Sequence, residues 1–439
     1  MAGPKPDFSS ALCAPGAGAE MYAFAEKIYP ICRSITGAGV RETLDHVGAR
    51  IPLERTETPT GTQVLDWTVP NEWSIREAYI ENAAGQRVVD FRNHNLHVLN
   101  YSAPIRARMP LAALKKHTFT LPDQPTLIPY RTSYYEERWG FCMSHNALLA
   151  LPDGEYNVVI DSTLAPGSLT YAEHVHYGES EEEVLLQAHI CHPSLANDNC
   201  SGIALLTQLA AALAPLKTRY TYRFLFAPGT IGAITWLARN EERAHRIKHG
   251  LVLSCVGDAG GPTYKRTRRN DAPIDRVMAH VLAQVSPQPN VIDFSPYGYD
   301  ERQYNSPGFK LDVGLFQRSL FATFPEYHTS ADDLSFIAPE HLELSLKIVA
   351  SAIDVLERDG RYRNTSPKGE PQLGKRGLYG AIGGDRDAYA SNMAMLWVLN
   401  LSDGDHSLLD IAERARVPFA TIAAAAEALE TGGLLVPAS

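Results

Sequence analysis

Histidine, aspartate and cysteine side chains are concentrated in one stretch of the chain, AHICHPSLANDNCSG, which begins at Ala188 and ends at Gly202. Apolar residues before it predict a strand and those after it predict a helix, so His189 ends the strand and Asp198 lies near the start of the helix. A carboxylate is stabilised near a helix N-terminus, and the two side chains can converge on one point. Imidazole nitrogen and carboxylate oxygen are the ligands that zinc takes where thiolates are not used. The stretch therefore indicates a zinc site, with a structural pair at a strand–helix junction as the alternative.

Two other segments carry the same types of side chain. Asp258 follows the apolar run Leu251–Val256, and the next residues, Ala-Gly-Gly, leave its carboxylate exposed past the end of a predicted strand. His328 lies in the loop PEYHTSADD, ahead of a predicted helix. Because parallel strands end at one edge of a sheet, these side chains can join His189 and Asp198 there. A zinc site that keeps an open coordination position is catalytic.

Three neighbouring features each have two interpretations. His192 is either an additional metal ligand or an anchor of its loop, and Cys191 is either a ligand or a buried thiol; we favour the second interpretation for both. The basic run Tyr264–Arg269 is either a solvated loop or a clamp for an anion, in which Arg266 and Arg268 would bind a substrate carboxylate or phosphate.

Strands alternate with helices from about residue 156 to the helix Pro339–Asp359, and the strands are continuous apolar runs that include Val158–Ile160. This pattern is typical of a sheet covered by helices on both faces, so we expect an α/β fold: an αβα sandwich with a mixed, mostly parallel sheet. Short alternating runs at 64–150 favour a small β domain, and three short helical patterns at 390–435 resemble a winged helix. We divide the chain into a discontinuous catalytic domain over 15–63 and 151–362, an inserted β-rich domain over 64–150 and a winged-helix-like domain over 378–439.

The ordered pattern of AHICHPSLANDNCSG, Asp258, the stretch Tyr299–Tyr304 leading to Gly308, and PEYHTSADD resembles that of the M28-like zinc aminopeptidases. These enzymes use two co-catalytic metals on a mixed αβα sheet, and the chain is most similar to their branch with an inserted β domain and a C-terminal winged helix. The resemblance spans nearly the whole chain.

The resemblance implies a role for each matching residue. His189 would bind one metal, Asp198 would bridge both, Asp258 would complete the first site and His328 would serve the second. Tyr327 would lie near the developing oxyanion. In the stretch Tyr299–Tyr304, we take Asp300 and Glu301 as candidate catalytic acids and Arg302 and Tyr304 as substrate contacts.

One position departs from that family. Where its members carry Pro-Glu-Thr, this chain has Pro228-Gly229-Thr230, and no Asp or Glu occurs from Phe224 to Asn240. Glu241 follows Ile231 by ten residues, about 15 Å along a helix, too far to return to the site. We therefore expect one firmly bound zinc and a weak or empty second position. The missing acid is also the proton acceptor, a group worth about 10²–10⁴-fold in rate, for which Glu301 is the first replacement to consider.

Charge and composition limit the partners. The 439 residues include 40 Lys and Arg against 50 Asp and Glu, a net charge of −10, which is the wrong sign for bulk attraction to nucleic acid or an anionic membrane. From residue 385 onward the chain has three arginines against eight acids, and the helix predicted over Phe419–Glu430 has no Lys, Arg, Asn or Gln. We therefore expect no nucleic-acid or membrane partner, and a C-terminal module that makes a homo-oligomer. Six scattered cysteines and the lack of a long apolar stretch predict a cytoplasmic protein.

Taken together, these features predict a zinc-dependent, aminopeptidase-like hydrolase that cleaves an amide or acyl bond of a small amino-acid-like or peptide-like substrate. Two alternatives remain open: a non-hydrolytic metalloenzyme of specialised biosynthesis, catalysing condensation, transfer or rearrangement, and an inactive binding scaffold.

Overall fold

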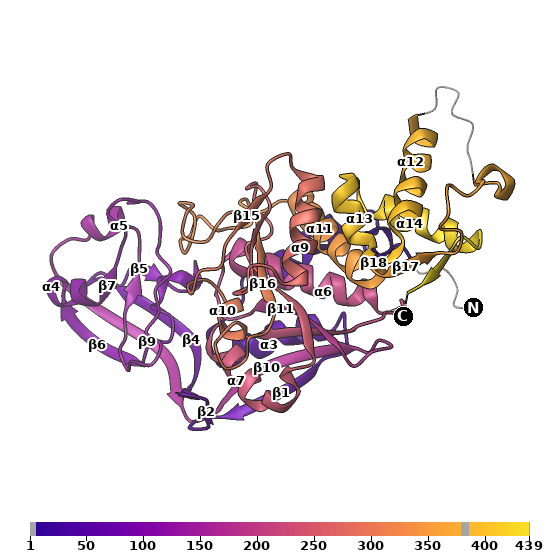
Figure 1. Ribbon diagram of the computed structural model, residues 1–439. Helices are drawn as coiled ribbons and strands as arrows, with labels where there is room; N and C mark the ends of the chain where they lie inside the picture. The colour runs from indigo at the N-terminus through magenta and orange to yellow at the C-terminus, as the bar shows by residue number, and fades with distance from the viewer. Residues whose placement is uncertain (1–5, 379–385, 439) are drawn as a thin grey trace. The chain divides into compact units, whose positions relative to one another are not determined.

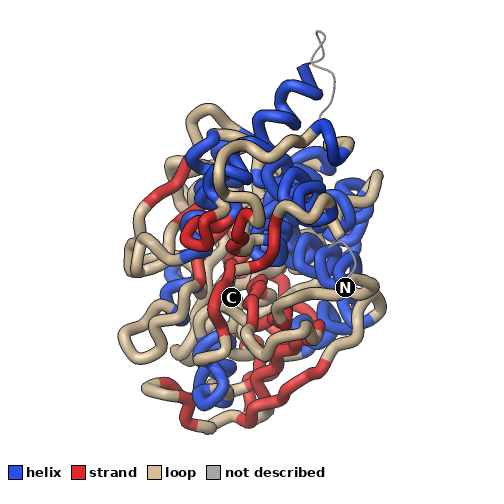
Figure 2. The backbone as a smooth tube through the Cα atoms, turned by 45° about the vertical axis from the view of Figure 1, so that its right-hand side comes forward, coloured by secondary structure: helices blue, strands red, loops and turns tan. Residues whose placement is uncertain are grey.

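The computed structural model describes residues 6–378 and 386–438 of the chain (Figure 1). They form two compact units. The larger unit comprises Pro15–Asp275 and Asn290–Leu346, and the smaller unit comprises the residues before Pro15, Arg276–Pro289 and the chain from Lys347 onward. Figure 2 distinguishes the helices from the strands within each unit.

An eight-stranded mixed sheet forms the centre of the larger unit, as the sequence predicts. Its order is β1 (Glu54–Pro59), β10 (Ser168–His176), β12 (Thr221–Ala227), β11 (Glu183–His189), β13 (Ile247–Leu253), β16 (Val313–Gln317), β14 (Thr263–Lys265) and β15 (Asn290–Ile292). The pairs β12–β11, β11–β13 and β13–β16 are parallel, whereas β1 and β10 run antiparallel to their neighbours. Every residue of β11 and β12 is buried, which explains why both strands are continuous apolar runs with few polar residues.

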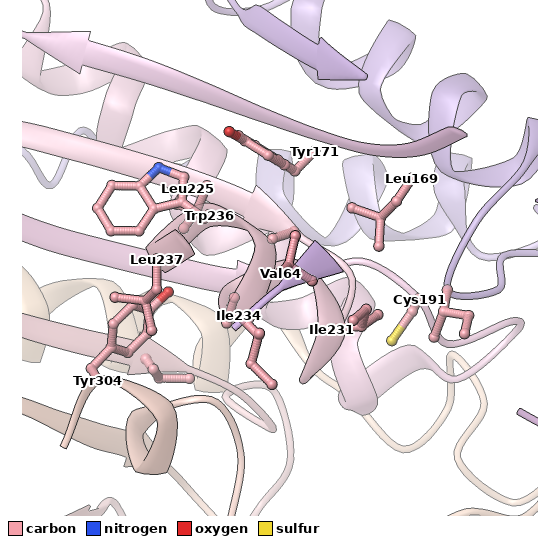
Figure 3. Packing of buried hydrophobic residues seen from close by; sticks show 14 of the residues in the cluster. Val64, Leu169, Tyr171, Cys191, Leu225, Ile231, Ile234, Trp236, Leu237 and Tyr304 are labelled. Atoms are coloured by element: carbon pink, nitrogen blue, oxygen red, sulfur yellow. The ribbon is translucent and has the colours of Figure 1, made fainter. Parts of the chain in front are cut away.

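Helices before and between the strands complete the α/β fold. They are α2 (Ala17–Ile28), α3 (Ala38–Gly48), α6 (Gly202–Leu213), α7 (Ile231–Arg239), α8 (Glu241–Ala244) and α10 (Glu301–Tyr304), with α9 (Pro273–Val285) and α11 (Pro339–Arg358) running from one unit's residues into the other's. The inner face of α7 packs on the sheet through Ile231, Ile234 and Trp236, which meet Leu225 of β12 and Tyr171 of β10 (Figure 3). This cluster extends to Cys191, so the core supports the loop that follows β11.

The order of the strands reverses at β11. The connection through α6 places β12 on one side of β11, and the connection through α7 places β13 on the other. At such a switch point the two connections leave the sheet in opposite directions and open a crevice beyond the carboxyl end of the strand. The last residue of β11 is His189, so the fold places the histidine-rich stretch at this crevice.

A second, four-stranded antiparallel sheet has the order β5 (Arg87–Asp90), β4 (Glu72–Glu81), β9 (Glu155–Ala165) and β6 (Ile105–Pro110). We expected Val158–Ile160 to be a strand of the parallel sheet, and this expectation is wrong because these residues lie in β9 and pair with β4 and β6. A short apolar run is expected in a buried central strand of either sheet. Its periodicity alone therefore could not show that it belongs to the four-stranded sheet. The small elements of this region are β2 (Gln63–Val64), β3 (Trp67–Thr68), η1 (Asn95–His97), α4 (Leu111–Leu114), η2 (Lys115–His117), β7 (Thr118–Phe119), β8 (Phe141–Cys142) and α5 (His145–Leu149).

The smaller unit contains the predicted winged helix. Its elements are α1 (Phe8–Ala11), β17 (Arg361–Asn364), η4 (Gly374–Arg376), α12 (Arg386–Leu401), β18 (Asp403–Ser407), α13 (Leu408–Ala415), α14 (Phe419–Thr431) and β19 (Leu435–Pro437), and the strands form a sheet of order β18-β17-β19. Ser407 and Asp410 form a capping box that fixes the start of α13, as the polar residues before Leu408 predict. Asp385, one of the eight acids counted above, lies outside the described residues. None of the helices in 6–378 and 386–438 has the length and hydrophobicity that crossing a bilayer requires.

Candidate metal centre

Three side chains meet at the carboxyl end of β11, two from one stretch of the chain and one from a loop 130 residues further on. The Asp198 carboxylate is completely buried, and its two oxygens lie 2.8 Å from His189 Nε2 and 3.1 Å from His328 Nε2. Asp198 belongs to the irregular turn η3 (Ala196–Ser201) that precedes α6. The structure therefore brings together three of the four residues that the sequence offered as metal ligands.

His192 is the fourth member of this cluster. Potential ligand atoms of His189, His192 and Asp198 all lie within 4.8 Å of one another. Burial lowers the pKa of His192 well below its usual range, which favours the neutral, metal-binding imidazole. Burial acts to raise the pKa of Asp198, but the neighbouring His192 and His189 outweigh it and hold that pKa well below its usual range.

Asp258 does not join the cluster. Its carboxylate accepts hydrogen bonds from Asn197 Nδ2 at 2.7 Å, Ser319 Oγ at 2.6 Å and the Gly260 amide at 2.6 Å. The preceding strand β13 ends at Leu253, five residues earlier, so Asp258 lies further along the loop than the predicted strand Leu251–Val256 implied. In this position it holds the Asn197 side chain beside Asp198.

A second buried carboxylate orients the backbone of the cluster. Asp332 accepts the backbone N–H groups of Asn197 at 2.6 Å and Asp198 at 3.0 Å, one on each oxygen. Burial raises the pKa of Asp332 well above its usual range. The PEYHTSADD loop thus contributes both His328 and the residue that fixes the Asp198 main chain.

The segment around Tyr130 supports the His328 loop. The Tyr130 amide donates to the His328 carbonyl at 2.8 Å, and the two rings lie 5.0 Å apart in an edge-on arrangement. The Ile128 amide donates to Ser330 Oγ at 3.0 Å. On the other side of His328, the Tyr327 ring stacks on the imidazole at 4.0 Å.

A pocket of about 340 Å³ opens beside the cluster, and its wall includes His189, His192, Asp300, Arg302 and Tyr327. The predicted site residues Asp300, Arg302 and Tyr327 therefore line one cavity. Tyr134 and Tyr135 also line it. Burial raises the pKa of Tyr327, which keeps its hydroxyl protonated and able to donate.

Glu301 and Tyr304 lie outside the pocket wall. Glu301 forms a buried ion pair with Lys265, with 2.8 Å between Oε1 and Nζ, and burial raises the pKa of this carboxyl. The hydroxyl of Tyr304 donates to Gln187 of β11. Lys265 was missed as an individual residue, because the sequence shows only that it belongs to a basic run.

Arg266 and Arg268 also have no place in the pocket wall. Arg266 Nη1 donates to the carbonyl of Asn270, within its own loop, and the amide of Arg268 donates to Asn305 Oδ1. These contacts agree with a structured surface loop, the first of the two interpretations of the basic run.

Gly229, where an acid was expected, borders the cluster. A Cβ built at this position would lie 3.4 Å from Cys191 Sγ and 3.8 Å from His189 Cβ, ordinary contact distances that leave room for a side chain. The adjoining acid is Asp300, whose oxygens accept the Thr230 amide at 2.6 Å and Gln187 Nε2 at 2.6 Å. Burial raises the pKa of Asp300. Gly229, which replaces the family's acid, lies in the loop 228–230, and Asp300 accepts a hydrogen bond from the same loop.

Comparison with known proteins identifies the family. Residues 22–359 match the model of a family described as a domain of unknown function, DUF4910, and residues 360–437 match a winged helix-turn-helix family. The chain belongs to the DUF4910 family. A protein of Clostridium acetobutylicum, named as a candidate polysaccharide biosynthesis protein with an aminopeptidase-like domain, is 52% identical over 412 residues, covering 94% of this chain and 95% of that protein.

Solved structures agree with this assignment. The crystal structure of a candidate peptidase from Clostridium acetobutylicum is 49% identical, covers 98% of each chain and superposes with a TM-score of 0.92. A zinc aminopeptidase from Bacillus subtilis, 13% identical, superposes with a TM-score of 0.57 and covers 78% of this chain and 94% of that one. At this identity the likeness shows the fold alone, and the fold of this DUF4910 chain is that of the zinc aminopeptidases.

Proposed function

We propose that this protein is a zinc-dependent hydrolase that cleaves an amide bond of a small acylated or peptide-like substrate. The observation that carries the proposal is the buried Asp198 carboxylate, shared between His189 and His328 beside a 340 Å³ pocket. A buried carboxylate surrounded by imidazoles is the donor set that a borderline divalent cation such as zinc prefers.

The donor set fits one zinc ion. His189, His192, Asp198 and His328 would hold it. Potential ligand atoms of the first three lie within 4.8 Å of one another, and His328 Nε2 lies 3.1 Å from an oxygen of Asp198. Asp258 would act behind Asn197 as a positioning residue because its oxygens already accept several hydrogen bonds. When bound, zinc supplies Lewis-acid activation of a carbonyl group and of water. A second ion would lack the acid that Gly229 replaces, so the proposed occupancy is one.

The protein's own groups would orient the substrate and carry protons. In hydrolysis the water oxygen bonds to the acyl carbon, the carbon–nitrogen bond breaks, and a proton from water ends on the departing nitrogen. Tyr327, next to His328, would donate a hydrogen bond to the substrate carbonyl oxygen as it gains negative charge. Asp300 is the carboxylate of the pocket wall outside the cluster. Because Thr230 and Gln187 already occupy its two oxygens, we assign it an inefficient transfer of the proton, with a low rate in the unmodified protein.

A non-hydrolytic reaction is the second candidate. Gly229 removes the acid that peptide hydrolysis uses in similar folds, and one relative carries a name connected with polysaccharide biosynthesis. Condensation or transfer on the same centre would need the substrate-orienting groups and no activated water.

Metal analysis combined with a hydrolysis assay tests the proposal. The purified full-length protein is expected to hold about one zinc per chain and to release the amine from N-acyl amino acids and short peptides. One zinc without hydrolysis would instead support the non-hydrolytic candidate. A protein without metal after supplementation with zinc would contradict both and leave the inactive binding scaffold.

A further inference from the structure

Arg302 lines the pocket with guanidinium donor atoms that the protein leaves unused. Its one hydrogen bond runs from Nη2 to Thr230 Oγ1 at 3.3 Å, and its buried Nε atom has no partner. No ion pair with Arg302 is formed within residues 6–378 and 386–438, although Asp300 lies near enough to interact with its charge. A guanidinium with free donor atoms can bind a carboxylate from outside through charge-assisted hydrogen bonds.

The acid of the pocket wall is not available to a positively charged ligand. Both oxygens of Asp300 already accept hydrogen bonds, from the Thr230 amide and from Gln187, and the side chain is buried. A substrate with a free ammonium group would therefore meet the Arg302 charge and find no exposed carboxylate in the wall outside the metal-binding cluster. This arrangement disfavours an unblocked amino terminus.

Aromatic side chains form the remaining wall. The Tyr299 ring stacks on His189 at 5.1 Å and contacts Phe321 at 5.6 Å, and Phe321 in turn contacts Tyr297 at 5.7 Å. Trp67 and Tyr135, 5.3 Å apart and both partly exposed, also line the pocket. Aromatic faces of this kind bind flat or ring-shaped apolar groups. These contacts form a row of rings that leads from His189 through Tyr299 and Phe321 to Tyr297. The Arg302 guanidinium carbon lies over the Tyr297 ring, 5.9 Å from its centre.

We propose that the pocket selects substrates that carry a carboxylate bound by Arg302 and a ring that packs on the aromatic wall, with the amino group blocked by acylation. Ring-bearing N-acyl amino acids are the substrate class with these properties. The inference rests on the proposed amide hydrolase, and it names the substrate of that site. It departs from aminopeptidase specificity, because it requires a free carboxylate and a blocked amine.

Calorimetric titration of the zinc-supplemented, full-length protein tests the proposal with three matched probes. N-acetyl-L-tyrosine has the carboxylate and the blocked amine, N-acetyl-L-tyrosine amide lacks the charge, and L-tyrosine amide has a free amine. We expect N-acetyl-L-tyrosine to bind about ten- to hundred-fold more tightly than its amide, the range for a charged hydrogen-bonded contact, and L-tyrosine amide to bind most weakly.

The variant Arg302→Gln separates binding by the guanidinium from binding by the metal. It should remove the preference for the carboxylate, whereas Arg108→Gln, on an exposed arginine of β6, should keep it. Equal binding of the three probes, tighter binding of L-tyrosine amide, or a carboxylate preference that survives in Arg302→Gln would overturn the inference. Metal content and hydrolysis, measured on the same samples, report on the proposed function independently: a carboxylate preference without hydrolysis would overturn the reaction and leave the ligand class intact.

Discussion

At the scale of single residues, Asp198 is the group on which the centre depends. Its oxygens face His189 and His328, and its backbone is held by Asp332. A carboxylate in this position neutralises a bound cation and also fixes two imidazoles, so its loss affects charge and geometry together.

We predict that Asp198→Ala and His189→Ala each lose the bound zinc while the fold persists. Each substitution removes one donor atom of the proposed four, and a site with three remaining ligands binds zinc far more weakly. The measurement is zinc per chain by elemental analysis, with circular dichroism as a check on folding. His245→Ala, at an exposed histidine whose Nδ1 contacts the Glu242 carbonyl, is the matched control and should keep its zinc. Full zinc content in either ligand variant would refute the assignment.

Gly229 offers a test in the opposite direction, a gain of activity. Gly229→Glu places a carboxylate beside His189 in a position whose Cβ meets only ordinary contacts. We expect this acid to act as a proton acceptor and to raise hydrolysis of simple amide substrates about 10²-fold from a low baseline.

Gly229→Gln has the same side-chain length without the charge, and its rate should stay at the baseline. The comparison uses initial rates at equal zinc content. Rapid hydrolysis by the unmodified protein would show that another acid, Asp300 or Glu301, already supplies the base, and an unchanged rate in Gly229→Glu would show that the acid does not reach the reacting atoms.

The residue types and order of the centre could be predicted from the sequence, but its exact membership could not. His189, Asp198 and His328 lie in segments whose composition indicates metal binding, and the structure brings them together. The proximity of His192 depends on how its loop turns, and Asp258 turns toward Asn197 because β13 ends early. Both outcomes depend on loop conformation, which hydrophobic patterns do not encode.

At the scale of secondary-structure elements, the site depends on β11, on the loop 228–230 and on the segment around Tyr130. The apolar runs of β11 and β12 made these strands predictable, and parallel packing places their carboxyl ends at one edge. The aromatic wall could not be predicted in the same way. Trp67 lies in β3, whereas Tyr135 and Tyr297 lie in two separate loops, and only the tertiary structure brings the three to one cavity.

The contact between Tyr130 and the His328 loop leads to an element-scale prediction. Tyr130→Ala removes the ring that packs edge-on against His328, although the backbone hydrogen bond between the two residues can remain. We expect zinc affinity to fall about ten-fold, the lower end of the range for loss of a group that orients a ligand. Competition with a chromogenic chelator measures this change.

Tyr130→Phe is the matched variant. It keeps the ring and removes only the hydroxyl that contacts Tyr134 at 2.9 Å, so its zinc affinity should stay close to that of the unmodified protein. Equal affinities for all three proteins would mean that His328 is held without this ring.

At the scale of the whole molecule, the C-terminal winged helix is the part whose role the metal centre does not explain. Winged helices often bind DNA through a helix that carries basic and amide side chains. Here α14 presents alanines and has no Lys, Arg, Asn or Gln, and its buried face packs inside its own unit through Phe419, Ile422 and Leu429. A surface with this composition cannot compensate phosphate charge or read base edges.

We therefore predict that the C-terminal module mediates self-association and does not bind nucleic acid. Static light scattering of the full-length protein should give a mass above that of one chain. Removing the residues after about 380 should lower that mass or reduce solubility, because the deletion takes away α12, α13 and α14 together. Ala424→Arg places a charge on an exposed position of α14 and tests the same surface with the module intact.

Fluorescence anisotropy with duplex DNA should show no binding at physiological salt. A monomeric full-length protein would contradict the first half of the prediction. Salt-sensitive DNA binding would contradict the second, since the acids of this module outnumber its arginines by eight to three.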